Sequence, residues 1–461
     1  MNLKRIFLIS VDCLRADHVG CIGGGNLTPN IDKIARDSLV FTRAFANGPG
    51  TSQSFPSILT STYFLMHGGR RLAPWVVTLA EALKAHGFKT VAFHSKPFLS
   101  SVFGWNKGFD EFYDFMERAR RPSTAFFITK AHERKPSKII TNIAEALGIT
   151  RIKLIERMRR KLSYLLTKFE MPYVEGKEIN EHVIRWLKGW RGERLFLWVH
   201  YMDTHIPFAP PSSWLRFFRS REEALMFNGM VNLRNPSDEE NEVLMKLYKG
   251  EVRYVDYCIG ELIDHLRDIG LLDDALMVIL ADHGEAFKEH GIFGHGYDIL
   301  YNEVIHVPLL IHGVEDHGYV KRFVELLDIP PTILDLCGIR KPRTFLGNNL
   351  LRCETEKPIF SESAKPDPIN LTYDTSRIAI SCIANGWKII INQMKGSIEL
   401  YNLMNDPKET HNLIKTEPDT GSALLDTVMK HLKDEKRLSV TFKIKSLKSA
   451  LKNGVIPSSL T

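Results

Sequence analysis

The sequence lacks the cysteine patterns of disulfide-rich and cysteine-ligated metal domains. Its six cysteines form no CxxC pair and no Cys/His spacing typical of a metal site. Scattered cysteines in a chain of 461 residues are typical of a reducing compartment and not of a disulfide framework. We therefore expect a single large core with an appended subdomain, or two or three ordinary domains, without covalent cross-links.

Long apolar runs are also missing. None approaches the roughly 18–20 residues that are needed to span a bilayer. The first residues, MNLKRIFLISVDCLRADH, combine a basic pair with a short apolar run, but Asp12 interrupts that run and no small-residue cleavage site follows. The sequence thus predicts neither a signal peptide nor a transmembrane segment, and we expect a cytoplasmic protein.

Positive charge is concentrated in one segment. The net charge is +7, yet residues 115–170 carry 14 Lys and Arg against 5 Asp and Glu. The simpler interpretation is a helical insertion with a solvated basic face. The alternative is a basic patch for an anionic substrate, a lipid headgroup or nucleic acid. Because no nucleic-acid-binding motif occurs there, we do not expect a nucleic-acid partner.

Short apolar strands alternate with amphipathic helices over most of the chain. This pattern predicts an α/β fold with a doubly wound, mostly parallel sheet covered by helices on both faces. Two of the expected strands are Leu39–Thr42 and Thr90–His94. The segments that carry the pattern are RIFLISVD, TPNIDKIARDSLVF, WVVTLAEALKAHGFKTVAFHS, RLFLWVHYMDTH and ALMVILADHGE.

The domain boundaries follow from a change of pattern near residue 356. Residues 1–355 form the expected catalytic domain, with a basic helical insertion at 115–175. The pattern of residues 356–440 predicts antiparallel strands around an Asn-Gly turn, followed by a helix. We therefore expect a small C-terminal α+β subdomain. The last residues, 441–461, are expected to be a loosely attached tail.

Polar side chains follow three of the apolar strands. In parallel α/β sheets the ligand lies beyond the carboxyl ends of the strands, so these side chains are candidate site residues. They are Asp12, Asp203, His205, Asp282 and His283.

The segment ADHGE is a candidate metal-binding turn. Asp282 and His283 can both reach one divalent ion if the backbone turns sharply, and Gly284 permits such a turn. Asp12 supplies a second carboxylate at the end of the first strand. Carboxylate and imidazole ligands suit Zn, Mn or Fe, and an oxygen-rich remainder favours Mg or Ca.

The uncharged segment ANGPGTSQSFPSILTST is either a polar linker or a loop that presents a nucleophile. Pro49-Gly50 makes a tight turn, and the free N–H groups of a helix that follows it would face an anion. A hydroxyl bound to a metal ion there could attack a sulfuryl or phosphoryl centre. Thr51 is the preferred nucleophile, and Ser52 and Ser54 are the alternatives.

Four further residues could contact an anionic substrate. His205 in HYMDTHIPF and His295 in GIFGHGYD could protonate a leaving oxygen or hold a substrate oxygen. Arg15 and Lys96 are candidate charge-neutralising groups. Taken one at a time, each is equally compatible with an ordinary surface or core side chain.

Together, these segments resemble the sulfatases of the alkaline phosphatase superfamily. Seven motifs of that family are similar to segments of this chain in the same order. The segments are LISVDCLRADHVGCIG, TPNIDKIARDSLVFTRAFA, HGFKTVAFHSKPF with GFDEF, WVHYMDTHIPFAPP, LADHGEAFKEHGIFGHG, LYNEVIHVPLLI and LYNLMNDPKETHNLI.

The resemblance implies a divalent metal ion (Ca, Mg, Mn or Zn) and roles for the candidate residues. It makes His205 and His295 catalytic residues that bind the substrate and its leaving group. It also implies that Asp203 binds substrate or helps to hold a second metal ion. The metal ligands that it implies are Asp12, Thr51, Asp282 and His283.

The chain departs from the family pattern at the nucleophile. Most sulfatases have two adjacent carboxylates in the first motif, whereas Cys13 follows Asp12 here. The usual nucleophile is a Cys, sometimes a Ser, in C-x-P-S-R, oxidised to formylglycine, but Ala46–Thr62 contains no Cys. No Arg follows Pro56-Ser57, and His94-Ser95-Lys96-Pro97 replaces a Gly-Lys-Trp-His segment. An unmodified Thr resembles the phosphodiesterase and phosphotransferase relatives.

The expected function is a metal-dependent sulfatase-family hydrolase that cleaves a sulfate ester through a covalent intermediate on Thr51. The alternatives are a phosphodiesterase, phosphonate monoester hydrolase or phosphotransferase on the same scaffold, and an inactive member that binds an anionic glycan or lipid. The expected partner is an anionic ester: a sulfated or phosphorylated glycan, lipid or small molecule. The oligomeric state stays open.

Overall fold

A computed structural model describes residues 3–67, 70–116, 171–215, 218–352, 356–367 and 372–452. Its centre is an eight-stranded sheet. Most neighbouring strands are parallel, and β11 is antiparallel to both of its neighbours, β7 and β2. The expected α/β fold with a mostly parallel sheet is therefore confirmed. In sheet order the strands are β12 (Gly318–Val320), β2 (Ser38–Phe41), β11 (Leu309–His312), β7 (Ala275–Ala281), β1 (Arg5–Val11), β6 (Leu195–Tyr201), β4 (Lys89–Phe93) and β5 (Glu111–Tyr113).

The three central strands bring the polar strand ends together. In β1 the last residue, Val11, lies opposite Tyr201 of β6 and Ala281 of β7. The residues that follow these three positions therefore leave the sheet at the same edge. All residues of β6 and β7 are buried, which explains their continuous apolar sequence.

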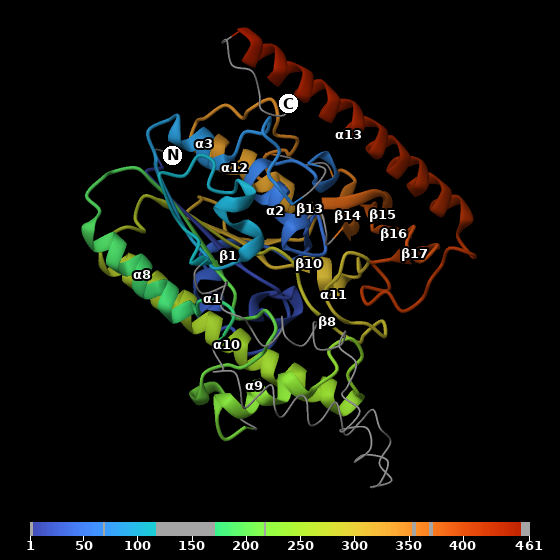
Figure 1. Cartoon of the computed structure of the whole chain (residues 1–461), viewed down its shortest axis with the longest axis horizontal. Coiled ribbons are helices and arrows are strands. Elements are labelled where there is room, and N and C mark those ends of the chain that lie inside the picture. Colours follow the sequence, from blue (N-terminus) through green and yellow to red (C-terminus); the bar gives the residue numbers. More distant parts are fainter. Residues whose placement is uncertain are drawn as a thin grey trace, which may run out of the picture.

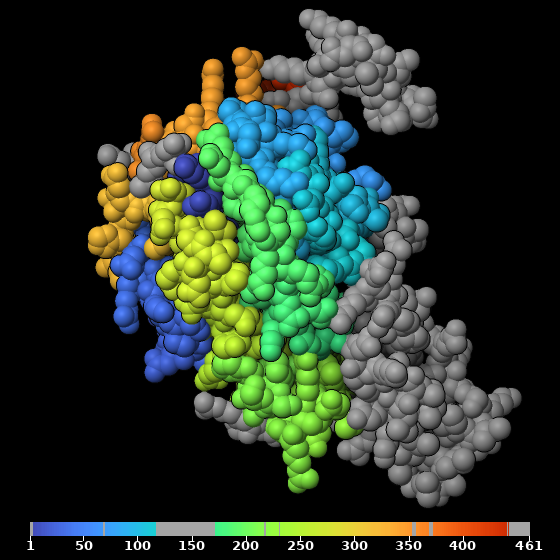
Figure 2. Space-filling model, turned by 90° about the vertical axis from the view of Figure 1, so that its left-hand side faces the viewer, coloured from blue at the N-terminus to red at the C-terminus, as the bar shows by residue number. Residues whose placement is uncertain are grey.

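Helices cover both faces of this sheet (Figure 1). Helices α1, α8 and α10 pack together on one face, and Figure 2 shows α8 and α10 side by side there. Helices α2, α3 and α12 pack together on the other face. The bounds are α1 (Pro29–Ala35), α2 (Thr51–Thr60), α3 (Leu79–Lys84), α8 (Gly176–Gly189), α9 (Arg221–Met230), α10 (Asp238–Asp268), α11 (Asn302–Ile305) and α12 (Ile329–Leu336).

Several short strands complete the catalytic domain. One small sheet has the order β10, β3, β13, and a two-stranded sheet joins β8 to β9. The predicted strands 39–42 and 90–94 are present as β2 and β4, each beginning and ending one residue earlier. The short strands are β3 (Ala44–Phe45), β8 (Ala286–Phe287), β9 (Phe293–Gly294), β10 (His306–Val307) and β13 (Val324–Glu325).

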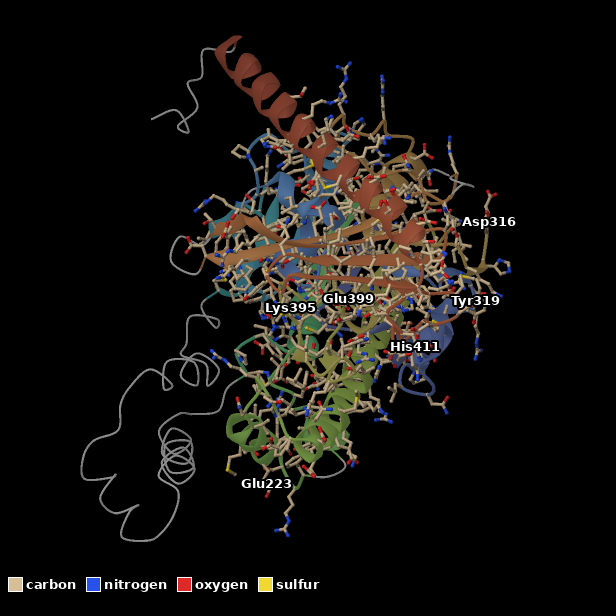
Figure 3. All side chains as sticks on the ribbon, turned by 90° about the vertical axis from the view of Figure 1, so that its right-hand side faces the viewer. Glu223, Asp316, Tyr319, Lys395, Glu399 and His411 are labelled. Atoms are coloured by element: carbon tan, nitrogen blue, oxygen red, sulfur yellow. The ribbon has the colours of Figure 1, made fainter. Side chains whose placement is uncertain are left out.

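The C-terminal part forms a four-stranded antiparallel sheet, as the sequence predicts. The expected turn lies at Asn385 and Gly386, with φ of 52° and 77°, which suits a tight hairpin. Helix α13 packs on this sheet (Figure 3). The elements are β14 (Ile359–Asp367), β15 (Thr372–Ala384), β16 (Trp387–Asn392), β17 (Ser397–Asn402) and α13 (Pro418–Lys452).

The expected C-terminal tail and the expected helical insertion are described to different extents by the structure. Helix α13 continues to Lys452, so it includes residues 441–452 of the expected tail. The expected helical insertion lies mostly outside the described residues, because 117–170 are not among them. Among the described residues, no helix combines the length and the apolar content required to cross a bilayer.

Candidate active site

Three predicted metal ligands meet at the carboxyl edge of β1 and β7. Asp12, Asp282 and His283 each offer one ligand atom, and these atoms lie within 4.8 Å of one another. All three side chains are fully buried. We call these three residues the acidic centre. Asp12 and Asp282 lie close together because β1 and β7 are parallel and the residues just before these two aspartates pair across the sheet.

The turn after β7 depends on the absence of a side chain at Gly284. A Cβ atom there would lie 2.2 Å from the carbonyl oxygen of Glu303. The Gly284 N–H donates to Val304 O over 2.7 Å, and its carbonyl oxygen accepts from Nδ1 of His283 over 2.9 Å. This second contact fixes the ring of His283 so that Nε2 faces the two carboxylates.

The buried surroundings shift the pKa values of the residues in the acidic centre. Burial raises the pKa of Asp282, and the negative charge of Asp12 raises it further. Burial would also raise the pKa of Asp12, but Lys96 and the neighbouring histidines together outweigh it and hold that pKa well below its ordinary value. Burial lowers the pKa of His283 to about 3, so its imidazole is neutral.

The donor set of the acidic centre fits a divalent metal ion. Two carboxylates and one neutral imidazole face one another, and Oδ2 of Asp282 has no hydrogen-bond partner among the described residues. A cation would satisfy that buried oxygen and neutralise the repulsion between Asp12 and Asp282. The residues present therefore suit the metal ion that the family resemblance implies.

Thr51 is the first residue of α2, as the sequence predicts, and it lies beside the acidic centre. Its Oγ1 donates to Oδ2 of Asp12 over 3.3 Å and lies 3.4 Å from Nε2 of His283. The carbonyl of Gly50 accepts from the amides of residues 53 and 54, so the amides of Thr51 and Ser52 come before the first intrahelical hydrogen bonds. The Thr51 hydroxyl thus sits at a helix N-terminus that favours an anion.

The two alternative nucleophiles lie on the same helix turn. Ser52 lines the cavity described below, and Oγ of Ser54 is buried without a hydrogen-bond partner among the described residues. Within the described part of the chain, neither serine forms a hydrogen bond with the acidic centre, whereas Thr51 contacts two of its members.

Two basic side chains contact Asp12 from the β4 and β6 side. Nζ of Lys96 lies 2.7 Å from Oδ2 of Asp12, and Nε2 of His200 lies 3.4 Å from the same oxygen. Lys96 was predicted as a charge-neutralising group, and its side chain is only 6% exposed. His200 was missed. Its signal was a basic residue inside the otherwise apolar strand LFLWVHY, where Ser10 Oγ lies 3.0 Å from its other nitrogen.

The structure brings His205 and His295 together at the open side of the acidic centre. Their ring centroids are 5.2 Å apart. Nδ1 of His295 lies 3.1 and 3.2 Å from the carboxylate oxygens of Glu285. Burial alone would lower the pKa of His295, but the charge of Glu285 and its hydrogen bond together raise it. Nδ1 of His205 donates to the carbonyl of Ile206 over 2.7 Å, and burial lowers the pKa of His205. One histidine therefore favours the charged form and the other the neutral form.

Cys13 lies inside the site and was recognised only as a departure from the family pattern. Its φ is 60°, which turns the chain directly after Asp12. Its thiol lies 3.0 Å from Oδ1 of Asp12 and 3.6 Å from Nδ1 of His295. Burial raises the pKa of Cys13, and the charge of Asp12 raises it further, so the group is a thiol and not a thiolate.

A cavity of about 170 Å³ opens beside Thr51. Several of its lining residues were not predicted, among them Arg70, Phe98 and Tyr373. The guanidinium of Arg70 lies 4.3 Å from the ring centroid of Phe98 and 5.7 Å from that of Tyr373. Nε of Arg70 is buried without a hydrogen-bond partner among the described residues. No local sequence signal links these residues, because they come from three separate segments. The predicted residues that line the cavity are Thr51, Ser52, Lys96, His205 and His295.

Arg15 and Asp203 do not line this cavity. The guanidinium of Arg15 forms ion pairs with Asp17 and Glu289, so its charge is already balanced within the protein. The carboxylate of Asp203 accepts a hydrogen bond from the amide of Gly176 over 2.9 Å, at the start of α8. The structure therefore does not bring either residue to Thr51, and among the described residues Asp203 belongs to no group of ligands that would support a second metal ion at the acidic centre.

Two protein-family models match the chain. The model described as "Sulfatase" matches residues 4–339, and the model described as "N-sulphoglucosamine sulphohydrolase, C-terminal" matches residues 288–437. The arylsulfatase of Clostridium perfringens is 24% identical over 447 residues and covers 90% of each chain. Arylsulfatase K of Bos taurus is 31% identical over 201 residues, which are 41% of this chain and 36% of that protein.

Solved structures show the same fold. The phosphonate monoester hydrolase of Silicibacter pomeroyi has a TM-score of 0.67 at 20% identity, covering 94% of this chain and 95% of that chain. A protein solved in complex with its substrate D-glucosamine-2-N,6-O-disulfate has a TM-score of 0.68 at 17% identity, covering 94% and 98%. Since the first family model spans well over half of the sequence, the chain belongs to the sulfatase family of hydrolases within the alkaline phosphatase superfamily.

Proposed function

We propose that this protein is a metal-dependent sulfate-ester hydrolase in which the unmodified hydroxyl of Thr51 is the nucleophile. The observation that carries the proposal is the position of Thr51 Oγ1, 3.3 Å from Asp12 and 3.4 Å from His283, at the first residue of α2. A divalent ion held by Asp12, Asp282, His283 and Thr51 would lower the pKa of the hydroxyl and offset charge on the sulfate.

The proposed reaction has two chemical steps, and different side chains act as acid and base in each. In the first step Oγ1 of Thr51 attacks sulfur and its proton passes along the hydrogen bond to Asp12. The sulfur–oxygen bond to the alcohol breaks, and the alcohol oxygen takes a proton from His295. Lys96 balances negative charge beside Asp12 throughout. The product of this step is a sulfo-threonine and a free alcohol.

The second step releases sulfate. Water attacks the sulfur of the sulfo-threonine, the bond between sulfur and Oγ1 breaks, and the proton on Asp12 returns to Thr51. His205 accepts the proton of the water through Nε2, because its Nδ1 already donates to Ile206. Two histidines with opposite protonation preferences can thus serve as acid and base in turn.

We propose a sulfated sugar as the substrate. Phe98 and Tyr373 add aromatic rings to the lining of the cavity at Thr51, which suits a sugar, and the guanidinium of Arg70 in the same lining suits a second anionic group. The protein solved with a glucosamine disulfate has the same fold, which supports this class without specifying the sugar. A sulfated lipid or small molecule is the wider class of anionic esters.

The phosphoryl branch is the alternative function, and one feature favours it. A sulfo-threonine lacks the second hydroxyl that lets a formylglycine hydrate expel sulfate. The similarity to a phosphonate monoester hydrolase is compatible with a phosphonate or a phosphate diester as substrate. A phosphotransferase would use the same covalent intermediate but pass the group to an acceptor other than water. A member that binds an anionic glycan or lipid without turnover is the third alternative.

We also propose that the protein works in the cytoplasm. The described cysteines, Cys13, Cys21, Cys258, Cys337 and Cys382, are free thiols, which suits a reducing compartment.

The test is turnover by metal-stripped protein resupplied with Ca, Mg, Mn or Zn in turn. The substrates are a matched aryl sulfate, phosphate monoester, phosphate diester and phosphonate monoester, with glucosamine sulfates added. We expect sulfate release that needs metal and falls by at least about 10³-fold in Thr51→Ala. A preference for the diester or phosphonate would move the protein to the phosphoryl branch. Turnover that survives Thr51→Ala would overturn the nucleophile and direct attention to Ser52→Ala and Ser54→Ala.

A further inference from the structure

A second group of metal-ligating side chains lies where α13 packs on the C-terminal sheet. Glu362 of β14 and His431 and Glu435 of α13 each offer one ligand atom, and these atoms lie within 4.8 Å of one another. We call these three residues the interface cluster. Their side chains are 0%, 10% and 4% exposed. The cluster shares no residue with the acidic centre or with the cavity at Thr51.

The geometry of the interface cluster is fixed by packing. His431 and Glu435 are four residues apart on α13, so their side chains project from the same helix face. The ring of His431 stacks on Phe360 at a centroid distance of 3.7 Å and meets Tyr63 edge-on at 4.7 Å. Its Nε2 lies 2.5 Å from Oε1 of Glu362 and 3.9 Å from Oε2 of Glu435. The imidazole is thus aimed between two carboxylates.

One carboxylate oxygen of the interface cluster lacks a hydrogen-bond partner among the described residues. This oxygen is the buried Oε1 of Glu435. Glu362 is better satisfied, since its Oε2 accepts from the amide of Leu65 over 3.2 Å. A buried carboxylate oxygen without a partner is costly, and it indicates a group that the side chains alone do not supply.

The charges of the interface cluster are not balanced by a lysine or arginine in the described part of the chain. The ion pairs of Glu362 and Glu435 are both with His431. Nearby, Lys357 lies 2.8 Å from Glu325 and 2.7 Å from Asp328, so its charge is used by those two carboxylates. Two buried carboxylates therefore share one imidazole.

We propose that the interface cluster binds one divalent transition-metal ion, for which Zn²⁺ is the best match. Carboxylate oxygen and imidazole nitrogen are both ligands that Zn²⁺ accepts, and water can supply the fourth ligand. Ligand atoms around a tetrahedral Zn²⁺ are about 3.3 Å apart. The observed separations of 2.5 and 3.9 Å lie on either side of that value, so small rotations of the two glutamates suffice.

The ion would tie α13 to β14, and both of these elements contact the catalytic domain. The amide of Glu362 donates to the carbonyl of Asn47 over 2.8 Å, four residues before Thr51. On the other side, Oγ of Ser439 in α13 donates to the carbonyl of Met66 over 3.3 Å. A metal ion between α13 and β14 would therefore hold the helix against the segments that flank α2. We assign it a structural role.

The experiment uses the full chain with Asp282→Asn, which removes one ligand of the acidic centre. The protein is stripped of metal, equilibrated with Zn²⁺ and measured for bound zinc and for melting temperature. We expect close to one Zn²⁺ per chain and an increase of the melting temperature by about 4 °C at a hundredfold excess over the dissociation constant. Glu435→Gln in the same background should lose both effects. Asp426→Asn, an exposed carboxylate on the same helix, should keep both.

Two further measurements make the result decisive. His431→Gln replaces Glu435→Gln if that variant fails to fold, and it should lose the same zinc. A crystal equilibrated with Zn²⁺ should show anomalous scattering between Glu362, His431 and Glu435. If Asp282→Asn protein binds no zinc, or keeps it after both substitutions, the proposal is overturned and the carboxylates share a proton instead.

Discussion

The acidic centre and the ion pair between Lys388 and Glu409 both bury charge, but they balance it differently. In the ion pair one ammonium lies 2.5 Å from one carboxylate, and neither side chain is exposed. Asn302 completes it, accepting from Lys388 over 2.9 Å and donating its amide to Glu409 over 2.6 Å. In the acidic centre two carboxylates face each other, and Lys96 contacts only Asp12.

The difference separates a structural polar group from a functional one. The ion pair joins β16 to the segment after β17, and Asn302 links both charges to the start of α11. Its charges therefore meet partners within the protein and hold the C-terminal subdomain in place. The acidic centre leaves Asp282 Oδ2 unsatisfied beside a cavity, which suits the binding of something from outside. Buried charge without an internal partner is costly and is retained where a ligand satisfies it.

The largest stability effect is expected from breaking the ion pair. Lys388→Met leaves Glu409 buried without its counter-charge, and we expect the free energy of unfolding to fall by about 3–5 kcal/mol. Chemical denaturation measures this. The control is Lys395→Met in the turn between β16 and β17 (Figure 3). Its ion pair with Asp298 is 39% and 29% exposed, and the loss of this pair should cost less than about 1 kcal/mol. Equal losses in the two variants would contradict the comparison.

Removing charge from the acidic centre should have the opposite effect on stability. Asp282→Asn relieves repulsion from Asp12, so the metal-stripped variant should be about 1–3 kcal/mol more stable than the stripped wild type. Metal-dependent turnover should fall by more than about 100-fold, because a direct ligand is lost. A stripped variant that is less stable than the wild type would show that Asp282 is satisfied within the protein.

The same substitution has a predictable pH dependence. The pKa of Asp282 is raised in the folded state, so the folded protein keeps a proton that the unfolded chain releases above about pH 4. The stability of the stripped wild type should therefore be greatest at low pH with respect to this group and decrease as pH rises toward neutrality. In Asp282→Asn this decrease should be smaller, as denaturation at several pH values would measure.

The smallest effect is expected at the rim of the cavity. Arg70→Ala removes a guanidinium from the lining of the cavity, and we expect KM for a sulfated sugar to rise about tenfold with kcat little changed. The neighbouring Arg71, which is exposed, provides the control variant Arg71→Ala. Steady-state kinetics on sugars with one and with two sulfates would measure both. A fall in kcat at constant KM would place Arg70 in the chemistry instead.

Much of the site could be predicted from the ends of strands, because strand ends can be recognised in the amino-acid sequence. Asp12, Asp282 and His283 each follow a continuous apolar strand, and parallel register brings such positions to one sheet edge. Thr51 was predicted from a turn and a helix start, which are also local features. The rim residues Arg70, Phe98 and Tyr373 were not found, because no local pattern marks side chains that meet only after folding.

The sequence by itself determined the α/β fold, the family and the members of the acidic centre, because strand periodicity, turn residues and motif order are encoded locally. Only the tertiary structure decided which candidates face Thr51. Arg15 and Asp203 lie next to predicted site residues in sequence, yet Arg15 pairs with Asp17 and Glu289, and Asp203 binds the start of α8. The physical reason is that a charged side chain forms its ion pair or hydrogen bond with whichever suitable group lies nearest in space. Tertiary packing determines which group that is.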